Sequence, residues 1–495
     1  MADQLSALDA TFLELEEADP SAHMHIGAVM VMEPQPGGGA PPLDQIHADV
    51  MARLPDLPRY THRLSTIRTS GLRWPNWVKH AGFRVERHVR RAALPAPAGI
   101  DELVEWAGEY FSHRLDRTRP LWEIVILELA DGRWAMVTKT HHCMIDGVGS
   151  VDIGTTLLDT QRERRVSPNA HANGDGDGSR TPPGDELTPS QLSRWRRTTV
   201  QLAKPYLAVG NAAVRAAESG LHAAESAFGI AVHPSRARDA VHRSKALAEL
   251  LIRDELISAP KSSLNRPIGT GRRLAVLTAE LDELKEIKNE LGGTLNDVVL
   301  AVTAGGLRRL LEHRGEEMPR AGLRAMVPVN VRTAGDRLAM GNRISTLFVH
   351  LPVAEGDPKR RYERQMEDAE TLKSGNQATG STTLIDITRH MPPVIHSFMA
   401  RSMYATRLFN LTITNVPGPQ LPLYYFGSKV DQIWPLVPIA ADHAVGLAVF
   451  SYDGTLYFCV NADRDTVPDL EVLREGIAES LTELGELAAK PTETG

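Results

Sequence analysis

The sequence predicts an α/β fold made of two core-forming units with mixed β-sheets, and three observations support this prediction. The chain has 495 residues, which exceeds the size at which one hydrophobic core stops growing. Apolar, β-branched-rich runs separated by tight turns alternate with segments of helical periodicity. The regular strand-helix-strand rhythm of a doubly wound nucleotide fold is missing, as is a glycine-rich phosphate loop.

Two strand pairs define the expected sheets. Residues 121–142 contain two apolar runs around a turn at 130–132, which predicts a β-hairpin whose second strand ends at two adjacent histidines. Residues 443–465 repeat this arrangement around a turn at 453–454. We therefore expect the two units to share an architecture, although no repeat is visible in the sequence itself.

Two consecutive helices are expected between these hairpins. Residues 279–291 have helical spacing and stop at a pair of glycines, after which residues 294–315 start a second helix. Thr294 and Asp297 have the three-residue spacing of a capping box, so Thr294 is the expected N-cap. Asn296 then lies in the first turn of the second helix.

A low-complexity stretch divides the chain. Residues 167–190 are rich in Gly, Pro, Ser and Asp and have almost nothing to bury, which predicts a linker. We expect an N-terminal subdomain over residues 1–166 and a C-terminal subdomain over residues 191–495. Residues 193–217 mix three arginines and a tryptophan with apolar residues, a pattern that fits a helix packed on its own domain or one lying at a membrane surface.

Composition narrows the class of protein. The net charge of -7 gives no overall attraction to nucleic acid, so nucleic acid is not an expected partner. The two cysteines, Cys143 and Cys459, are too far apart for a metal knuckle or a disulfide framework, which fits a reducing cytoplasm. The N-terminus is acidic where a secretory signal is basic, and no run of about 18 apolar residues occurs. We expect a cytoplasmic protein that is soluble or peripheral to a membrane.

The sequence HHCMIDG at residues 141–147 is the clearest candidate site. If the strand stays regular to its end, His142 shares a face with Thr140, whereas His141 shares the opposite face with Lys139. The two rings would then diverge instead of converging on one ion. We therefore expect no metal here.

The residues after the histidine pair favour acid-base chemistry. Asp146 and the glycine-containing run 147–149 lie where a strand gives way to a loop, and a neutral imidazole with a pKa near 6.5 is suited to remove a proton from an alcohol. Asp146 would either orient this loop through a buried ion pair or cap the following helix. Cys143 should point away from His142 and pack as an apolar residue. A hydrogen-bonded histidine without chemistry remains the alternative for His142.

Motifs spread along the chain resemble those of the bacterial wax ester synthase/diacylglycerol acyltransferases. HHCMIDG matches the HHxxxDG signature, which this family shares with condensation domains and polyketide-associated acyltransferases. More specific matches are LSALDATFLELE with HMHIG, Pro120-Leu121-Trp122, SLNRPIG, LNDVVLA, VPVNVR with GNRIS, and NVPGP. Two departures stand out: Arg266 occupies a position where the family usually has glycine, which puts a close backbone approach there in doubt, and residues 167–190 match nothing in the family.

The resemblance implies two chloramphenicol acetyltransferase-like subdomains, with the active site at their interface and one channel for each substrate. It implies that His142 is the general base of a direct acyl transfer and that His141 supports the loop. Asp146 would be mainly structural. The backbone N–H near Gly147 and the side chain of Asn296 would be candidate oxyanion donors, although ordinary helix-start chemistry also explains Asn296.

The activity implied by this resemblance is esterification of diacylglycerol to triacylglycerol by a long-chain acyl-CoA, with fatty alcohols as further acceptors that yield wax esters. Acyl-CoA would be a co-substrate, and no cofactor is expected. Contact with the inner membrane or with lipid droplets would be peripheral. Two other readings are an acyltransferase that uses a carrier-bound donor and a lipid-binding protein without catalysis. Trp122 is expected in the core, since an aromatic residue at a strand start is more often packed than exposed to a ligand.

Overall fold

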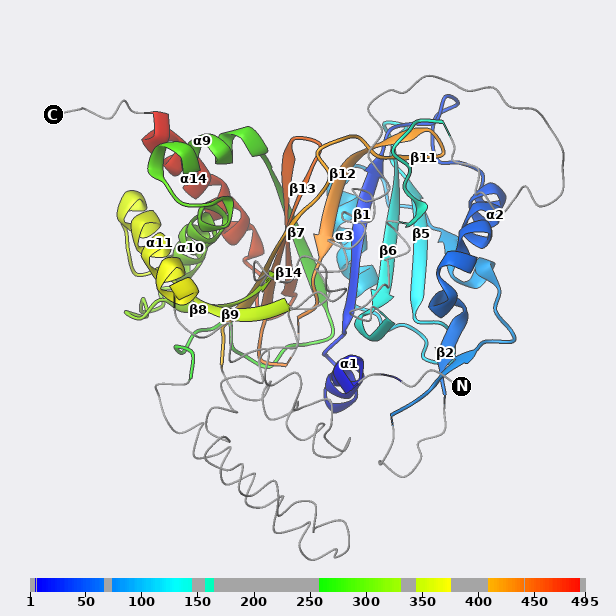
Figure 1. Cartoon of the computed structure of the whole chain (residues 1–495), viewed down its shortest axis with the longest axis horizontal. Helices are drawn as coiled ribbons and strands as arrows, with labels where there is room; N and C mark the ends of the chain where they lie inside the picture. The colour runs from blue at the N-terminus through cyan, green and yellow to red at the C-terminus, as the bar shows by residue number, and fades with distance from the viewer. Residues whose placement is uncertain are drawn as a thin grey trace, which may run out of the picture.

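The computed structural model contains two six-stranded sheets that lie side by side (Figure 1). It describes residues 5, 7–65, 74–144, 156–163, 258–330, 344–374, 408–439 and 441–489. Both sheets combine parallel and antiparallel pairs, which confirms the predicted mixed α/β class.

The first sheet has the strand order β11-β12-β1-β6-β5-β4. Its strands are β1 (His25–Met32), β4 (Val89–Arg91), β5 (Trp122–Glu128), β6 (Trp134–His141), β11 (Tyr424–Tyr425) and β12 (Ser428–Leu436). The central strand β1 pairs antiparallel with β6 on one side and with β12 on the other, whereas β4 and β5 run parallel. A separate two-stranded sheet joins β2 (His62–Leu64) and β3 (Trp77–Lys79).

The second sheet has the order β7-β14-β13-β10-β8-β9. Its strands are β7 (Arg272–Glu280), β8 (Leu323–Asn330), β9 (Ile344–Leu351), β10 (Leu411–Pro417), β13 (Val445–Tyr452) and β14 (Thr455–Asp463). β10 runs parallel to both of its neighbours, and the remaining pairs are antiparallel.

The helices divide between the two sheets. They are α1 (Ala7–Ala18), α2 (Leu43–Arg53), α3 (Ile100–Phe111), α9 (Leu281–Leu291), α10 (Leu295–His313), α11 (Pro358–Ser374) and α14 (Leu470–Ala489). Short 3₁₀ turns are η1 (Leu54–Asp56), η2 (Pro58–Thr61), η3 (Val85–Arg87) and η4 (His142–Met144). Figure 1 shows α9, α10, α11 and α14 gathered on the outer side of the second sheet, with α1 at the lower end of β1.

The two predicted hairpins are confirmed. β5 and β6 pair antiparallel around Gly132, and β13 and β14 pair around Asp453 and Gly454. Gly132 in the first turn has a φ of +85°. In the second turn, Asp453 and Gly454 have φ angles of +46° and +87°, and a type I′ turn requires positive φ at both of these central positions. Each of the two sheets thus contains one of the predicted hairpins.

The predicted helix start at Thr294 is also confirmed. The backbone N–H of Asp297 donates to Thr294 Oγ1 at 3.3 Å, and the backbone N–H of Thr294 donates to Asp297 Oδ2 at 2.9 Å. These reciprocal bonds satisfy amide donors that the first turn leaves without helical partners. The preceding helix α9 ends at Gly292, whose φ is +86°.

One part of the topology was absent from the sequence prediction. β11 and β12, from the last fifth of the chain, complete the first sheet, and Gly27 of β1 lies opposite Leu436 of β12. The first sheet therefore draws on both sides of the predicted linker. That linker, at residues 167–190, and the arginine-containing stretch 193–217 lie outside the described residues, so the subdomain boundaries stay predictions.

Three apolar clusters form the core. The first surrounds the first sheet and also takes in residues of β7, β10, β13 and β14. The second lies within the second sheet and its helices, and the third joins residues from both halves of the molecule. Its fully buried members are Phe12, Leu15, Ala22 and Met24 from the N-terminal region and Met326, Leu408, Phe409, Val437 and Ala448 from the second half. We call this third group the interface cluster.

Arg272, at the start of β7, ties the two halves together beside the interface cluster. Its guanidinium donates to the backbone carbonyls of Ser21 and Gly269 and lies 3.8 Å from the Asp463 carboxylate. Its backbone N–H donates to Ser112 Oγ at 2.6 Å. Burial lowers the pKa of Arg272 to about 10, so the side chain stays protonated at neutral pH.

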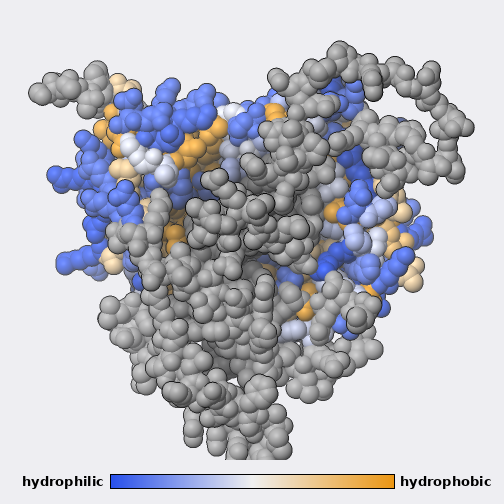
Figure 2. All heavy atoms as spheres, in the orientation of Figure 1, coloured by the Kyte–Doolittle hydropathy of each residue, from blue (hydrophilic) through white to orange (hydrophobic). Residues whose placement is uncertain are grey.

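The described surface is mostly polar. Figure 2 shows hydrophilic residues over much of the described part of this face, with hydrophobic residues in smaller patches. Met51 is the exposed large hydrophobic residue in the described segments, at 47% exposure. Among the described helices, none combines the length and the apolar character that crossing a membrane requires.

Candidate active site

The histidine pair lies at the end of β6. The strand ends at His141, and His142 begins the 3₁₀ turn η4. The regular strand therefore ends one residue before His142, although the backbone N–H of His142 still donates to the carbonyl of Met24 at 2.8 Å, in register with the β1–β6 ladder. The direction of the His142 ring follows from this turn and not from strand alternation.

His142 is buried, at 1% exposure, against helix α1. Its ring stacks on Phe12 with a centroid distance of 3.6 Å and an interplanar angle of 19°. Because Phe12 belongs to the interface cluster, His142 lies beside the apolar contact between the two halves. The residues that meet there come from elements far apart in the sequence.

His141 makes two hydrogen bonds that determine its tautomer. The backbone N–H of Cys143 donates to His141 Nδ1 at 3.1 Å. A backbone N–H can only donate, so Nδ1 carries no proton and the ring proton lies on Nε2. Nε2 donates in turn to Glu16 Oε2 at 3.2 Å. His141 is thus a neutral ring that links α1 to the turn carrying His142.

Glu16 is a functional candidate that sequence reasoning missed. Its side chain is only 2% exposed, and Oε2 accepts from Arg117 Nη2 at 2.5 Å as well as from His141. Burial opposes ionisation of this carboxyl, but the hydrogen bond from His141 and the charge of Arg117 hold its pKa well below the ordinary value. The available signal was the four-residue spacing of Phe12 and Glu16, which places a carboxylate on the apolar face of a helix.

Other titratable groups near the strand end are buried as well. Burial and the charge of Lys139 keep the pKa of His25 well below its ordinary value, and burial together with Arg272 lowers that of His23 to about 4. Lys139 Nζ donates to the carbonyls of Tyr110 and His113 at 2.8 and 2.6 Å, and burial lowers its pKa to about 8. The two imidazoles are therefore neutral at physiological pH.

Two expectations for residues around the pair are confirmed. Cys143 is fully buried, and burial raises the pKa of its thiol well above the ordinary value, so it is neither exposed nor a thiolate at neutral pH. Trp122 is also fully buried and donates its indole N–H to the carbonyl of Tyr60 at 2.7 Å. Both side chains belong to the core of the first half.

For the other expected site residues, the structure describes only the surroundings of Asn296. Asp146 and Gly147 lie outside the described residues, so their roles stay predictions. Asn296 is partly buried in the first turn of α10, next to the capping box of Thr294 and Asp297. The structure thus describes Asn296 at a helix start, and its part in oxyanion binding also stays a prediction.

The described residues contain no group of three His, Cys, Asp or Glu side chains that could hold a metal ion. At the end of β6, two imidazole nitrogens that could bind a metal already accept hydrogen bonds from backbone N–H groups. His141 Nδ1 accepts from Cys143, and His25 Nε2 accepts from Leu115 at 3.4 Å. These two nitrogens are committed to protein hydrogen bonds.

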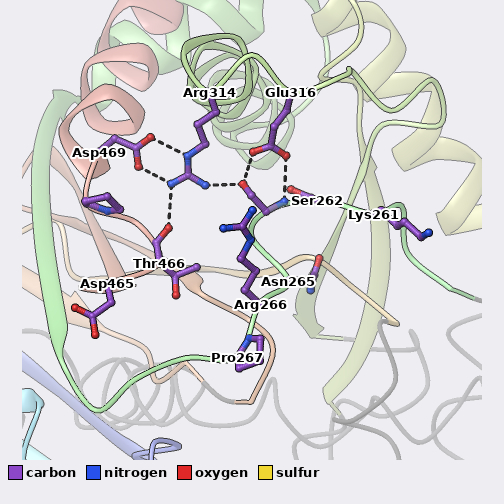
Figure 3. A pocket seen from close by; sticks show the side chains of 12 residues that line it. Lys261, Ser262, Asn265, Arg266, Pro267, Arg314, Glu316, Asp465, Thr466 and Asp469 are labelled. Carbon is purple, nitrogen blue, oxygen red and sulfur yellow. Dashed lines mark hydrogen bonds and ion pairs between the residues drawn. The ribbon is translucent and has the colours of Figure 1, made fainter.

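A separate pocket of about 960 Å³ lies in the second half of the molecule (Figure 3). Its walls carry paired charges: Arg314 binds both carboxylate oxygens of Asp469, and Glu316 accepts from the backbone N–H of Ser263 at 3.0 Å. Arg266, which stands where glycine is usual in the related family, lines this pocket and is exposed. Such a polar pocket does not suit a long alkyl chain.

Sequence comparison identifies relatives over nearly the whole chain. Residues 5–299 match the wax ester synthase/diacylglycerol acyltransferase catalytic domain, and residues 340–485 match the C-terminal domain of the same family. A Mycobacterium tuberculosis protein named "Probable diacyglycerol O-acyltransferase tgs1" is 32% identical over 97% of this chain and 95% of its own. A second M. tuberculosis protein, named "Probable diacyglycerol O-acyltransferase tgs2", is 29% identical over 96% of this chain and 97% of its own.

Solved structures support the fold. The wax ester synthase/diacylglycerol acyltransferase of Marinobacter aquaeolei VT8 aligns with a TM-score of 0.67 at 23% identity, covering 99% of this chain and 100% of its own. The first condensation domain of the CDA synthetase aligns with a TM-score of 0.53 at 13% identity, covering 99% and 97%. From the two family matches and the near-full-length similarity to the M. tuberculosis relative, the chain belongs to the wax ester synthase/diacylglycerol acyltransferase family of acyltransferases.

Proposed function

We propose that this protein transfers the acyl chain of a long-chain acyl-CoA to the free hydroxyl of diacylglycerol, which forms triacylglycerol. Long-chain alcohols are further acceptors and give wax esters. The observation that carries this proposal is the buried His142 of the HHxxxDG sequence, placed beside an apolar cluster between two sheets. The names of the M. tuberculosis relatives support diacylglycerol as the acceptor. Acyl-CoA acts as a co-substrate, and the transfer uses no further cofactor.

In this proposal His142 is the general base. Its neutral ring removes the hydroxyl proton of the acceptor while the hydroxyl oxygen attacks the thioester carbonyl carbon. The tetrahedral intermediate then collapses with cleavage of the carbon–sulfur bond. The proton held by His142 passes to the departing sulfur, so that the products are an ester and free CoA. Acyl transfer is direct and needs no acyl-enzyme.

The apolar surroundings of His142 support hydrophobic substrates. Phe12, Met24 and Phe409 are fully buried members of the interface cluster. Burial of an alkyl chain contributes about 0.8 kcal/mol per methylene, so chains of several lengths bind with graded affinity and no sharp cut-off. Exclusion of water from this region also protects the thioester from hydrolysis.

Three further parts of the proposal concern residues whose roles are untested. Asp146 orients the loop after His142, and the backbone N–H near Gly147 and the Asn296 side chain stabilise the oxyanion, each donor contributing about 3 to 4 kcal/mol. Asn296→Ala with unchanged turnover would remove Asn296 from the site.

Residues 193–217 hold the protein at a membrane or lipid-droplet surface, and their deletion should release it into the soluble fraction without loss of activity on dispersed substrate.

Two other functions make different predictions. An acyltransferase with a carrier-bound donor would not turn over free acyl-CoA. A lipid-binding protein without catalysis would bind diacylglycerol but release no CoA. The family matches over both halves of the chain support the acyl-CoA-dependent enzyme over either of them.

The deciding experiment measures release of free CoA from palmitoyl-CoA, with dioleoylglycerol and hexadecanol as separate acceptors. We expect turnover with dioleoylglycerol in the wild type, near-complete loss in His142→Ala, and a milder loss in His141→Ala. The ratio of the two acceptor rates reports the preferred substrate. Full activity of folded His142→Ala would refute the general-base role, and an inactive wild type with both acceptors would refute the proposed activity.

A further inference from the structure

Helix α1 and the end of β6 are joined by a buried carboxylate–imidazole hydrogen bond between residues 125 positions apart. The Glu16 and His141 side chains are 2% and 1% exposed, respectively. Since the tautomer of His141 places its only ring proton on Nε2, Glu16 receives the single hydrogen bond that this ring can donate. The helix therefore controls the orientation of the His141 ring.

The other nitrogen of His141 acts on the backbone beside His142. The N–H group of Cys143 belongs to the peptide unit that joins Cys143 to His142, and this N–H donates to His141 Nδ1. Fixing that peptide plane restricts the backbone ψ angle of His142. A rotation of the His141 ring would break this bond, so the ring orientation set by Glu16 is passed on to the turn η4.

The same helix contacts the ring of His142 directly. Phe12 precedes Glu16 by four residues, so both side chains project from one face of α1. Phe12 stacks on His142, while Glu16 binds the neighbouring His141. One face of α1 thus restrains the ring of His142 by stacking and its backbone through hydrogen bonds.

Arginines from the segment after α3 hold the carboxylate and the helix in place. Arg117 binds Glu16 Oε2 through Nη2 and Nε, at 2.5 and 3.2 Å. Arg114 donates to the backbone carbonyl of Glu16 at 2.6 Å, at the end of the helix where carbonyls lack helical partners. The position of Glu16 is therefore fixed from two directions.

We propose that Glu16 is a positioning residue for acyl transfer: its carboxylate holds the Nε2–H tautomer of His141, and His141 Nδ1 then fixes the turn that presents His142 to the substrates. This inference rests on the proposed role of His142 as the general base. Glu16 itself does not touch the reacting atoms. Its contribution is geometric, and displacement of a reacting group by about 1 Å can lower turnover by about 100-fold.

The first test compares Glu16→Gln with Glu17→Gln in the CoA-release assay. Glutamine has the shape of glutamate but carries no charge, so its single oxygen accepts from His141 and Arg117 more weakly than the carboxylate Oε2 does. We expect kcat of Glu16→Gln to fall about 30- to 100-fold, with KM for both substrates within about threefold of the wild type. Glu17 pairs with Arg117 at 3.0 Å on the exposed side of the same helix, so Glu17→Gln should keep kcat within about twofold.

The second test separates the two bonds of His141. His141→Gln keeps a donor near the Nε2 position, and His141→Asn keeps an acceptor near the Nδ1 position. We expect each variant to lower kcat. Because His141→Asn already cuts the link to Glu16, adding Glu16→Gln to it should change kcat less than about twofold. If Glu16→Gln does not fold at the assay temperature, Glu16→Asp replaces it in the same cycle.

The outcomes separate this inference from the proposed function. If His142→Phe is inactive but folded Glu16→Gln has wild-type kcat, the positioning role is wrong and the general base is unaffected. Multiplicative losses in the double variant would show that Glu16 acts independently of His141, which also contradicts the inference. If His142→Phe retains wild-type activity, the proposed base itself is wrong.

Discussion

A buried imidazole lies in close contact with a phenylalanine in each half of the molecule, and these two stacks have nearly the same geometry. His142 lies on Phe12 with ring centroids 3.6 Å apart, and His443 lies on Phe409 with ring centroids 3.8 Å apart. The interplanar angle is 19° in both. Both phenylalanines belong to the interface cluster.

The two stacks differ in what holds them. Charged and ionisable groups surround the first one, where Glu16 binds both His141 and Arg117. Neutral amides hold the second: Asn265 donates to the carbonyls of Phe409 and Asp442 at 3.1 and 2.9 Å. Similar ring geometry therefore does not imply similar chemistry. The charged network that fixes a tautomer and a turn distinguishes the candidate catalytic histidine from its structural counterpart.

The largest expected difference is in activity. His142→Phe and His443→Phe both keep an aromatic ring for the stack but remove the imidazole nitrogens. We expect kcat/KM for CoA release to fall at least about 1,000-fold in His142→Phe, since the base is lost, and less than about fivefold in His443→Phe. Equal losses in two folded variants would break the distinction between the stacks.

The next effect is a pH dependence that Lys139 contributes in the first half. Lys139 in β6 has a folded-state pKa of about 8 because of burial, below its ordinary value of 10.5. Between these pH values the unfolded chain binds more protons than the folded chain, so the free energy of unfolding rises with pH. We expect the wild type to gain about 3 kcal/mol relative to Lys139→Met between pH 7.5 and 10.5, measured by urea unfolding. If the free energy of unfolding changes with pH in the same way for the wild type and Lys139→Met, the lowered pKa of Lys139 is contradicted.

A smaller effect is expected for the amide that holds the second stack. Asn265→Ala removes hydrogen bonds to Phe409 and Asp442 and leaves Asn410 Nδ2 without its 2.6 Å acceptor. We expect a loss of about 2 to 3 kcal/mol in the free energy of unfolding, with kcat of the folded protein within about threefold of the wild type. Asn289→Ala on helix α9 is the control and should change stability by less than about 0.5 kcal/mol. A catalytic defect without a stability loss would assign Asn265 to the site.

The smallest effect should be the same in both halves. Gly132 and Gly454 occupy the two hairpin turns with φ of +85° and +87°, and no atom would come closer than 3.8 Å to an added Cβ at either position. Gly132→Ala and Gly454→Ala should each lower the free energy of unfolding by about 1 kcal/mol, because only backbone strain changes. Thermal unfolding measures the shift in melting temperature of each variant. Unequal shifts would mean that the two hairpins differ in more than their turns.

Features encoded by neighbouring residues were predicted correctly. The hairpins at Gly132 and Gly454 follow from turn residues between apolar runs, and the helix start at Thr294 follows from a capping pair three residues apart. The burial of Trp122 and Cys143 was also predicted. In each of these cases the physical cause is local or depends only on the apolar character of the side chain.

Features that depend on distant contacts were missed. Glu16 becomes part of the site because α1 packs across the end of β6, and nothing near residue 16 specifies that partner. The chain leaves the strand at His142 to form the 3₁₀ turn η4, although the His142 N–H still bonds the carbonyl of Met24 in register with the β1–β6 ladder. Strand alternation therefore does not determine how the ring of His142 is directed. A carboxylate placed on the apolar face of a helix is the one local sign that such a contact exists.

The position of β12 in the first sheet has a consequence for biosynthesis. β12 begins about 290 residues after His141, yet it is the strand that covers the free edge of β1. At a ribosomal rate of about 5 to 20 residues per second, β1 waits roughly 15 to 60 s for this partner after β6 has emerged. During that interval the nascent N-terminal sheet exposes an unpaired edge strand, which is a template for pairing with other chains. The first sheet is thus the part of the protein with the greatest need for a chaperone during synthesis.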